Sequence, residues 1–462
     1  MRNLAYCYAM NISTTQHDVE LNHFSAKKRQ DTLRALQAEQ ADVCHNSHAG
    51  LVNMHMHSFY SYNAYGWSPS RLVWEAHKAG LHAAGLVDFD VLDGLEEFLG
   101  ACRQLGVRGT VGIETRVYLA EMADKEISSP GEPGVTYIMG MGFPRLPAVG
   151  SDAAATLASF REQYDLRNLA MIERINSALP EISLDYEQEA KPLTPAGGVT
   201  ERHIVRAYRE KSEAVFKGNT DAAIAFWTKV LSKDREAIKA LLANIPAFEE
   251  AIRTKLTKKG GIGYEAPSDK TFPPVDAFIT WVVANKAIPM IAWLDGTSDG
   301  EANPALLLEC QVSKGAAALN IVPDRNWNIK DPMQQEIKVR NLDSIVKTAV
   351  AMELPINIGT EMNKDGLPYA DDLQGPVLKR FAREFMEGAN VMVGQTLLAR
   401  YAGCAFASSE ADGAFGNRHK QIKAYAQVGA APALLAAEAV ALETARPDQA
   451  LAILMDRTKQ YM

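Results

Sequence analysis

The stretch LVNMHMHSFYSYNAYGWSPSRLVWEAHKAGLHAAGLVDFD, residues 51–90, decides the fold class of this chain. Its beginning, VNMHMHS, is a short apolar run that predicts a strand. The next segment, SPSRLVWEAHKAG, predicts a helix that Ser68 caps and whose first turn holds Pro69. The apolar run HAAGLVDFD then predicts a second strand. A strand, a helix and a strand in this order favour a parallel sheet or a β/α barrel.

The same rhythm continues to about residue 144 and returns after residue 280. The apolar runs VRGTVGIETRVYLA and VTYIMGMGF belong to the first part, and AIPMIAWLDG, AAALNIVPDRNWN and LPINIGTEMNKDG to the second. The sequence between the two parts, and the alanine-rich sequence from about residue 376, are helix-forming. We therefore predict four regions: an N-terminal helical arm (1–50), a discontinuous β/α barrel (51–144 and 281–375), a helical insertion (145–280) and a C-terminal helical region (376–462).

Composition favours a cytoplasmic globular protein with more than one module. The 462 residues are 47% hydrophobic and 23% charged, and one core of ordinary size does not accommodate so long a chain. The N-terminal twenty residues lack the long apolar core of a signal peptide. Five cysteines without paired spacing are typical of reduced thiols: Cys7, Cys44, Cys102, Cys310 and Cys404.

Charge and hydropathy restrict the partners. The formal net charge of −8 argues against a broad nucleic-acid-binding face. No run approaches 18 apolar residues, so we expect no membrane span. A small molecule is the expected partner, and the helical regions fit either a cap over the barrel mouth or a homo-oligomer interface.

Two histidines, His55 and His57, stand one residue apart in the first predicted strand. Alternate side chains of a strand point to the same face, so both imidazoles would converge on one point and suit a divalent metal ion. A histidine on a strand is also often a structural residue whose hydrogen bonds are satisfied. Candidates at other strand ends favour the metal site, because those ends form the active rim of β/α barrels: Asp88, Asp90, Glu114, Asp295, Arg325 and Glu361.

These motifs resemble those of the PHP family of metal-dependent phosphoesterases (polymerase and histidinol phosphatase type). The family shows HxHTxxSDG, then AGL…TDHD and then G.E, and here HMHSFYS, AGLHAAGLVDFD and GIE are similar to them. ERHIVRAY resembles a later R-x-H-I-A-x-A segment, while MIAWLDG and IGTEMNKDG stand where AHP and GSDxHG are usual. The resemblance covers roughly residues 51–120, the stretch around 203 and residues 286–366. It implies an α/β fold, a distorted (β/α)7 TIM-like barrel.

The resemblance also implies ligands for one metal ion. They are His55, His57, Glu114 and Glu361, with glutamate in place of the aspartate of the last motif. Asp88 is either an outer ligand or a residue that orients one of the histidines.

The other two metal sites of the family are incomplete in this chain. His203 matches one ligand of the second site, but Trp293 replaces the histidine of AHP. At the third site, Tyr62 or Asn63, Phe89 and Asn363 stand where ligands are usual. The chain is therefore identified as a divergent member with a partly dismantled site. We expect one or two divalent ions per chain, either Zn²⁺, Mn²⁺ or Fe²⁺.

Further polar residues near the predicted strand ends suit substrate binding. We predict this role for Arg325, Asn326, Asn363, Lys364 and Arg418. The structural alternatives are that Arg325 pairs with Asp324 or Glu361, and that Arg418 lies in a solvated loop. Asp295 is the candidate general base, or else caps the next turn.

Three functions follow as hypotheses. The first is a metal-dependent hydrolase, a phosphoesterase that acts on a small phosphorylated metabolite. The second keeps the metal but is a lyase, an isomerase or a non-phosphate hydrolase on a sugar-like or carboxylated substrate. The third is a barrel that binds a ligand without turnover.

Overall fold

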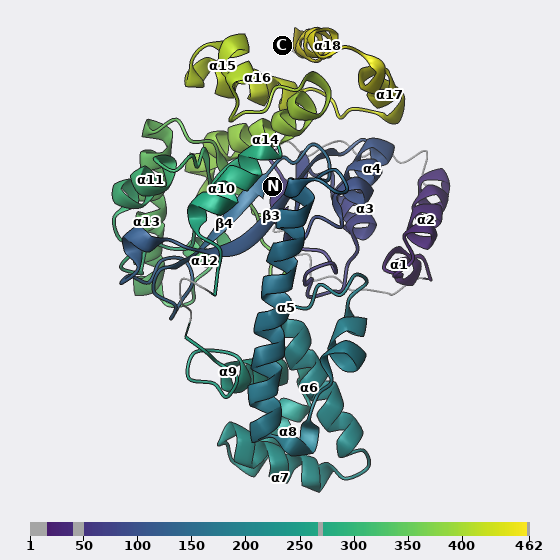
Figure 1. Cartoon of the computed structure of the whole chain (residues 1–462), viewed down its shortest axis with the longest axis vertical. Helices are drawn as coiled ribbons and strands as arrows, with labels where there is room; N and C mark the ends of the chain where they lie inside the picture. The colour runs from purple at the N-terminus through teal and green to yellow at the C-terminus, as the bar shows by residue number, and fades with distance from the viewer. Residues whose placement is uncertain (1–15, 40–49, 267–270, 460–462) are drawn as a thin grey trace, which may run out of the picture.

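The computed structural model describes residues 16–39, 50–266 and 271–459. Seven strands form one sheet in sequence order (Figure 1). They are β1 (Val52–Met56), β2 (Ala83–Phe89), β3 (Arg108–Tyr118), β4 (Val135–Met141), β5 (Ile288–Trp293), β6 (Ala318–Ile321) and β7 (Ile356–Ile358). A parallel bridge between Met56 and Glu361 brings the two sheet edges together. The predicted distorted seven-stranded β/α barrel is confirmed.

Closure of the barrel depends on a close approach of two backbones. Gly359 follows β7, and a Cβ atom at this position would lie 2.3 Å from the backbone nitrogen of His55 and 2.6 Å from Oδ1 of Asn53. Real side chains do not tolerate such distances. Only glycine therefore lets the end of β7 reach β1.

One strand departs from the expected parallel arrangement. β4 is antiparallel to both β3 and β5. Its connection to β3, residues 119–134, contains only the 3₁₀ turn η1 (Ala120–Met122) and no crossover helix. The chain therefore turns back as a hairpin at this point.

Helices cover the outside of the barrel. They are α3 (Pro69–Ala79), α4 (Leu95–Leu105), α10 (Val275–Ala284), α11 (Pro304–Val312), α12 (Asp324–Trp327) and α13 (Pro332–Ala351). α3 starts as predicted, with the Ser68 hydroxyl accepting a bond from the backbone nitrogen of Arg71 at 3.0 Å. Every residue of β1 is buried, because helices cover one face and the barrel interior covers the other.

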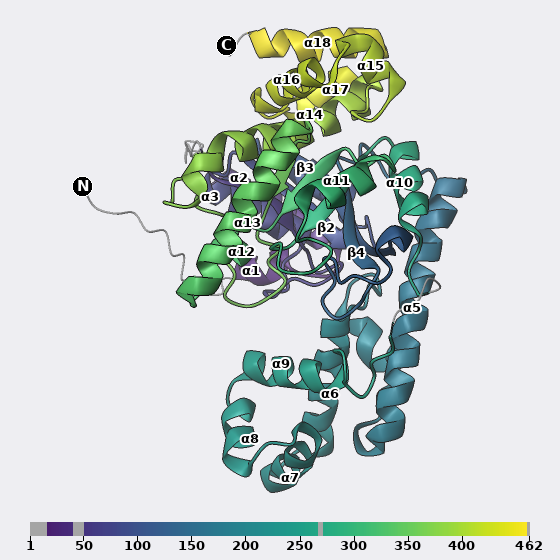
Figure 2. The same cartoon turned by 90° about the vertical axis from the view of Figure 1, so that its left-hand side faces the viewer.

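The segment between β4 and β5 projects beyond the barrel as a helical lobe (Figures 1 and 2). It contains α5 (Asp152–Ala178), α6 (Glu201–Val215), α7 (Thr220–Leu231), α8 (Arg235–Leu242) and α9 (Ile245–Leu256), with short turns η2 (Pro180–Ile182), η3 (Tyr186–Ala190) and η4 (Lys191–Leu193). Trp227 and Phe248 are fully buried in a hydrophobic cluster of its own. Near the barrel, His203 lies against Tyr62 with the ring centroids 5.2 Å apart. Since Tyr62 follows β1, this lobe reaches the mouth side of the barrel.

The C-terminal helices lie at the opposite end of the barrel (Figure 1). They are α14 (Ala382–Ala402), α15 (Ser409–Phe415), α16 (Arg418–Ala430), α17 (Ala436–Thr444) and α18 (Pro447–Lys459), after the turn η5 (Leu378–Phe381). His82, just before β2, donates to Asn390 of α14 at 2.7 Å, and Arg108, the first residue of β3, donates to Ala431 at 2.8 Å. This region therefore covers the N-terminal ends of the strands. The idea that it caps the barrel mouth is wrong.

The N-terminal arm is described only in part. Within the predicted helical arm, the described residues contain two helices, α1 (Gln16–Leu21) and α2 (Ala26–Glu39). Three of the five cysteines are free thiols: Cys102, Cys310 and Cys404. Cys7 and Cys44 lie outside the described residues. No helix in the described ranges has the length and apolar character to span a membrane. The predicted boundaries of the four regions remain a proposal.

Candidate metal centre

Three side chains from two strands converge inside the barrel. His55 lies on β1, His57 follows directly after this strand, and Glu114 lies on β3. Oε2 of Glu114 is 3.3 Å from Nε2 of His55 and 3.5 Å from Nε2 of His57. All three residues are buried, and their ligand atoms lie within 4.8 Å of one another. Within the described ranges, this is the one such group of His, Cys, Asp or Glu residues.

Glu361 is tied to the two histidines through its backbone. Its nitrogen donates to the carbonyl of His55 at 2.8 Å, and its carbonyl accepts from the nitrogen of His57 at 3.0 Å. Glu361 has a φ of 61° and the next residue, Met362, a φ of 56°. Such left-handed conformations cost energy for residues with side chains, and they persist where the surroundings impose them.

The Glu361 carboxylate contacts one cation and one side-chain amide. Its Oε2 accepts from Arg325 at 3.0 Å and from Asn363 at 3.1 Å. Although burial opposes ionisation, Arg325 and the two histidines lower the pKa of Glu361 to about 2. Glu361 thus borders the group of three as an ionised side chain whose Oε2 is already engaged.

The two histidines differ in basicity. Burial lowers the pKa of His57 well below its usual value, and the neighbouring His55 adds to this effect. Burial also disfavours a charge on His55, but the Glu114 carboxylate outweighs it and raises the pKa of His55. His57 is therefore a neutral imidazole at neutral pH.

Asp88 acts on His57 through a serine. Its carboxylate accepts from the Ser58 nitrogen at 2.7 Å, the Ser58 hydroxyl at 2.7 Å and the Ser61 hydroxyl at 2.6 Å. Ser61 Oγ lies 3.5 Å from Nδ1 of His57. Burial raises the pKa of Asp88 to about 6 in spite of these bonds. Of the two roles predicted for Asp88, the geometry matches orientation of a histidine, because both oxygens are occupied.

The surroundings of one atom, Nε2 of His57, indicate whether these residues fit a divalent ion. Nε2 of His57 is buried and has no hydrogen-bond partner, although it faces Glu114. A bare imidazole nitrogen, a second imidazole and a carboxylate are a ligand set that suits Zn²⁺, Mn²⁺ or Fe²⁺. The three side chains therefore fit a divalent cation.

The residues that correspond to the family's second and third metal sites, which we expected to be incomplete, do not form a further group of ligands in the described part of the chain. Nδ1 of His203 accepts from the Thr200 nitrogen at 3.1 Å, so this histidine caps α6 and does not join the group of three. Trp293, in place of a ligand of the second site, is buried. Phe89 stacks on the ring of His57 with centroids 4.2 Å apart, which places an apolar ring where the third site would need a ligand. His203, predicted as a metal ligand, is therefore not one of the three converging side chains.

Three predicted functional residues have structural roles instead. Asp295 forms an ion pair with Lys338 at 2.8 Å and accepts from Thr297, as the alternative of a turn cap anticipates. Asn326 is fully buried and donates to the carbonyls of Leu294 and Val322. Arg418 stacks on Phe406 at 4.6 Å on the C-terminal helices, at the far end of the barrel. The structure therefore does not bring these three side chains to the group of His55, His57 and Glu114, and their roles as base and substrate ligands stay predictions.

The remaining predicted substrate ligands lie near the centre. Arg325 and Asn363 both contact Glu361, and the Arg325 side chain is 45% exposed. Lys364 is exposed in the loop that follows. Arg116, which the sequence interpretation missed, follows Glu114 by two residues on β3 and therefore shares its face. Its side chain is 33% exposed and pairs with Glu132 at 2.8 Å.

Two buried asparagines were also missed. Nδ2 of Asn320, on β6, lies 3.3 Å from Nδ1 of His55, and Asn357, on β7, donates to Asn320 at 2.9 Å. The signal was present in the sequence. Each asparagine stands in the middle of a short apolar strand, ALNI or INI, where a polar side chain needs a partner.

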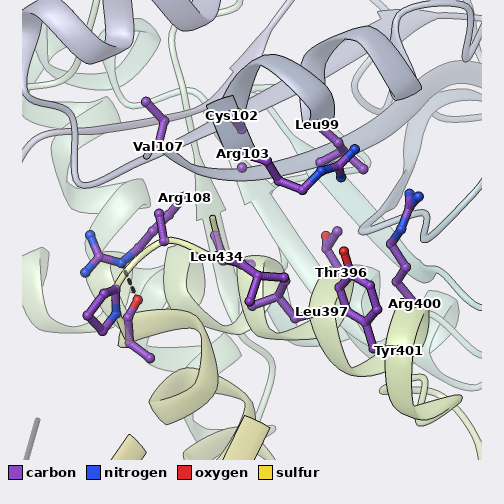
Figure 3. A pocket seen from close by; sticks show the side chains of 15 residues that line it. Leu99, Cys102, Arg103, Val107, Arg108, Thr396, Leu397, Arg400, Tyr401 and Leu434 are labelled. Atoms are coloured by element: carbon purple, nitrogen blue, oxygen red, sulfur yellow. Dashed lines mark hydrogen bonds between the residues drawn. The ribbon is translucent and has the colours of Figure 1, made fainter. Parts of the chain in front are cut away.

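A separate small pocket lies at the other end of the barrel (Figure 3). α4 contributes Leu99 and Arg103, and α14 contributes Leu397 and Tyr401. Its volume of about 40 Å³ accommodates only a few water molecules. It is not part of the centre around His55.

One family model matches part of the chain. The family model described as PHP domain matches residues 53–249, which include β1 to β4 and most of the helical lobe but neither Glu361 nor β5 to β7. No curated protein matches the chain.

Two solved structures are similar at low identity. An amidohydrolase from Chromobacterium violaceum, with bound sulfate and no metal, is 16% identical, with a TM-score of 0.47 over 72% of this chain and 95% of that one. A protein from Bifidobacterium adolescentis, proposed to be a metal-dependent phosphoesterase, is 18% identical, with a TM-score of 0.43 over 71% and 96%.

Proposed function

We propose that the chain is a metal-dependent hydrolase, and more specifically a phosphoesterase that acts on a small phosphorylated metabolite; the match of residues 53–249 to the PHP domain model supports this. The observation that supports this most is the convergence of Nε2 of His55, Nε2 of His57 and Oε2 of Glu114 inside the barrel. We propose one divalent ion at this point, either Zn²⁺, Mn²⁺ or Fe²⁺. Cytoplasmic location and a small-molecule partner are parts of the same proposal.

Each side chain has a definite task in this proposal. A divalent ion held by these three residues would polarise a phosphoryl oxygen and lower the pKa of a coordinated water. Arg325 is a partly exposed cation beside Glu361, and Arg116 is a partly exposed cation on the same face of β3 as Glu114. Both suit the binding of phosphate oxygens. Asp88 and Ser61 hold the ring of His57, and Phe89 covers one face of that ring. The His57 imidazole is thereby kept in one orientation.

A second candidate function is supported by the stacking of Phe89 on His57. Phosphomonoester hydrolysis in the resembling family relies on several metals, and this stacking leaves no ligand for the third one. A lyase, an isomerase or a non-phosphate hydrolase for a sugar-like or carboxylated compound needs only one metal.

The first test is elemental analysis of the purified chain. We expect about one equivalent of a divalent metal in the unaltered protein and none in His55→Ala/His57→Ala. The variant His419→Ala is the control, because His419 is exposed on α16, far from the centre. Absence of metal, and no uptake of Zn²⁺, Mn²⁺ or Fe²⁺, would contradict both candidate functions and leave a binding barrel.

The second test separates the two reactions. The metal-loaded chain is assayed with sugar phosphates and p-nitrophenyl phosphate, and then with sugar acids. Release of phosphate that chelation abolishes supports the phosphoesterase. Retained metal without phosphate release supports the second candidate.

A further inference from the structure

The two histidine rings of the centre have opposite hydrogen-bond patterns. An amide nitrogen can only donate, so Nδ1 of His55 accepts from Nδ2 of Asn320 at 3.3 Å. The proton of the neutral ring then resides on Nε2, which faces Glu114. At His57 the two nitrogens have the opposite roles, with the proton on Nδ1 and none on Nε2. The Ser61 hydroxyl donates to Asp88, so it can only accept from Nδ1 of His57, and Nε2 stays bare.

The orientation of Asn320 is itself determined by its neighbours. The register of β6 and β7 pairs Asn320 with Asn357, and Nδ2 of Asn357 donates to Oδ1 of Asn320 at 2.9 Å. The same Nδ2 donates to the Met54 carbonyl at 3.2 Å. A backbone carbonyl can only accept, so turning the Asn357 amide would bring two oxygens together. Both asparagines are at most 2% exposed, so water does not replace these bonds.

We propose that Asn357 and Asn320 form an amide relay that positions His55 and keeps its ring proton on Nε2, the nitrogen that faces Glu114. The relay starts at the Met54 carbonyl and ends at Nδ1 of His55. Nε2 of His57 carries no proton, whereas Nε2 of His55 carries one, and both nitrogens face Glu114. Asn320 and Asn357 are therefore positioning residues, and His57 is ready for a cation before His55 is.

The relay has a consequence for the metal that rests on the proposed function. A cation bound at Nε2 of His55 expels the proton from this atom. The neutral His55 ring would then carry its proton on Nδ1. Asn320, however, presents an N–H donor to this atom and not an acceptor. A carboxylate at this position accepts from Nδ1, as carboxylates beside metal-binding histidines commonly do. We expect Asn320→Asp to bind Zn²⁺ or Mn²⁺ about tenfold more tightly.

The decisive experiment is ¹⁵N nuclear magnetic resonance of the metal-free chain, labelled at histidine. We expect the His55 signals to show a protonated Nε2 and a bare Nδ1, and the His57 signals to show the reverse. His55→Gln and His57→Gln identify the two sets of signals. A proton on Nδ1 of His55 in the unaltered chain would overturn the relay, whether or not any variant folds.

Variants of the two asparagines extend the test, including one at Asn357, which does not contact the His55 ring. Asn357→Leu does not touch His55, yet it releases Asn320, so the ring proton should no longer be confined to Nε2. Asn320→Asp should move it to Nδ1. Asn53→Asp is the matched control, because it adds the same carboxylate to the barrel interior where Asn53 contacts Thr360 and the backbone but not the His55 ring.

Unchanged His55 signals in Asn357→Leu, or an equal shift in Asn53→Asp, would contradict the relay. Binding of Zn²⁺, measured by calorimetry, tests the proposed function and not the relay. If the unaltered chain binds no metal, the proposed function fails, while the resonance measurement still decides the relay.

Discussion

Glu361 and His55 are joined through the backbone, with the Glu361 nitrogen donating to the His55 carbonyl at 2.8 Å. This bond closes the barrel and places the carboxylate of the last strand beside the two histidines of the first. Its side chain is nevertheless directed to Arg325 and Asn363. The centre thus has three converging ligands and a fourth acidic group that a cation and an amide already engage.

Arg325 and a bound metal would compete for the Glu361 carboxylate, which leads to a prediction for Arg325. Arg325→Met removes the cation that pairs with Glu361, so a metal gains a free carboxylate and loses a nearby positive charge. We expect the Kd for Zn²⁺ or Mn²⁺ to fall several-fold. Phosphate recognition loses its best donor at the same time, so kcat/KM for a phosphoester should fall about 100-fold. Calorimetry and steady-state kinetics measure the two effects.

Arg340→Met is the control for this prediction. Arg340 is exposed on α13 and carries the same charge. It should change neither quantity by more than about twofold, as surface charges generally have small effects. Weaker metal binding in Arg325→Met would show that Arg325 supports the site and does not compete for it.

Ser61 gives a second prediction. The Ser61 hydroxyl connects Asp88 to His57, whereas the Ser58 hydroxyl contacts Asp88 and the backbone nitrogen of Tyr60. Ser61→Ala should lower metal affinity about tenfold, because the His57 ring loses the group that orients it. Ser58→Ala removes a hydroxyl from the same carboxylate and should lower the affinity much less. Equal losses in the two variants, measured by calorimetry, would mean that Asp88 acts through the loop and not through His57.

The barrel could be predicted because its strands and helices are encoded locally. Ser68 and Pro69 mark the start of α3, and the apolar runs mark the strands. The antiparallel β4 could not be predicted in this way, because the hydrophobic pattern of a strand is the same in either direction. The connection from β3 holds no crossover helix, and only this distinguishes the two directions. The placement of the C-terminal helices depends on long-range contacts such as His82 with Asn390. No local pattern contains these contacts.

The centre was predictable in part for a related reason. His55 lies on β1 and His57 directly after it, so their spacing of two residues brings the two rings to the same side. Glu361 was predicted as a metal ligand and lies beside them, but it is not one of the three converging side chains. Its pairing with Arg325 was one of the structural alternatives considered for that arginine. Asp295 and Arg418 are polar residues near predicted element ends, and such ends occur at both faces of the barrel. Sequence does not tell which end a helix after the last strand will cover.

Metal binding should also stabilise the fold. The three ligands come from β1 and β3, so a bound ion links two strands in the native state only. At a free metal concentration of 100 times Kd, the free energy of unfolding should rise by about 2.7 kcal/mol. Thermal unfolding with and without Zn²⁺ measures this change. His57→Gln should show no rise, and a rise of the same size in that variant would place the ion elsewhere.

The last prediction concerns Asp371, in the loop after β7. It is 2% exposed, and neither carboxylate oxygen has a hydrogen-bond partner. Burial raises its pKa to about 8, and the nearby Asp324 adds to the effect. Between its unfolded pKa of about 3.9 and its folded pKa, the native state holds a proton that the unfolded chain has lost. Stability from this group is complete at lower pH and is lost as the pH rises toward 8.

We therefore expect the free energy of unfolding to include a term from Asp371 that falls by up to about 1.4 kcal/mol per pH unit from about pH 4 to 8. Asp371→Asn should remove this slope and make the chain more stable at pH 8, as measured by urea unfolding across the range. Asp372→Asn is the control, because Asp372 is the exposed neighbour. An unchanged slope in Asp371→Asn would mean that the carboxyl is not protonated in the native state and that a cation or water satisfies it.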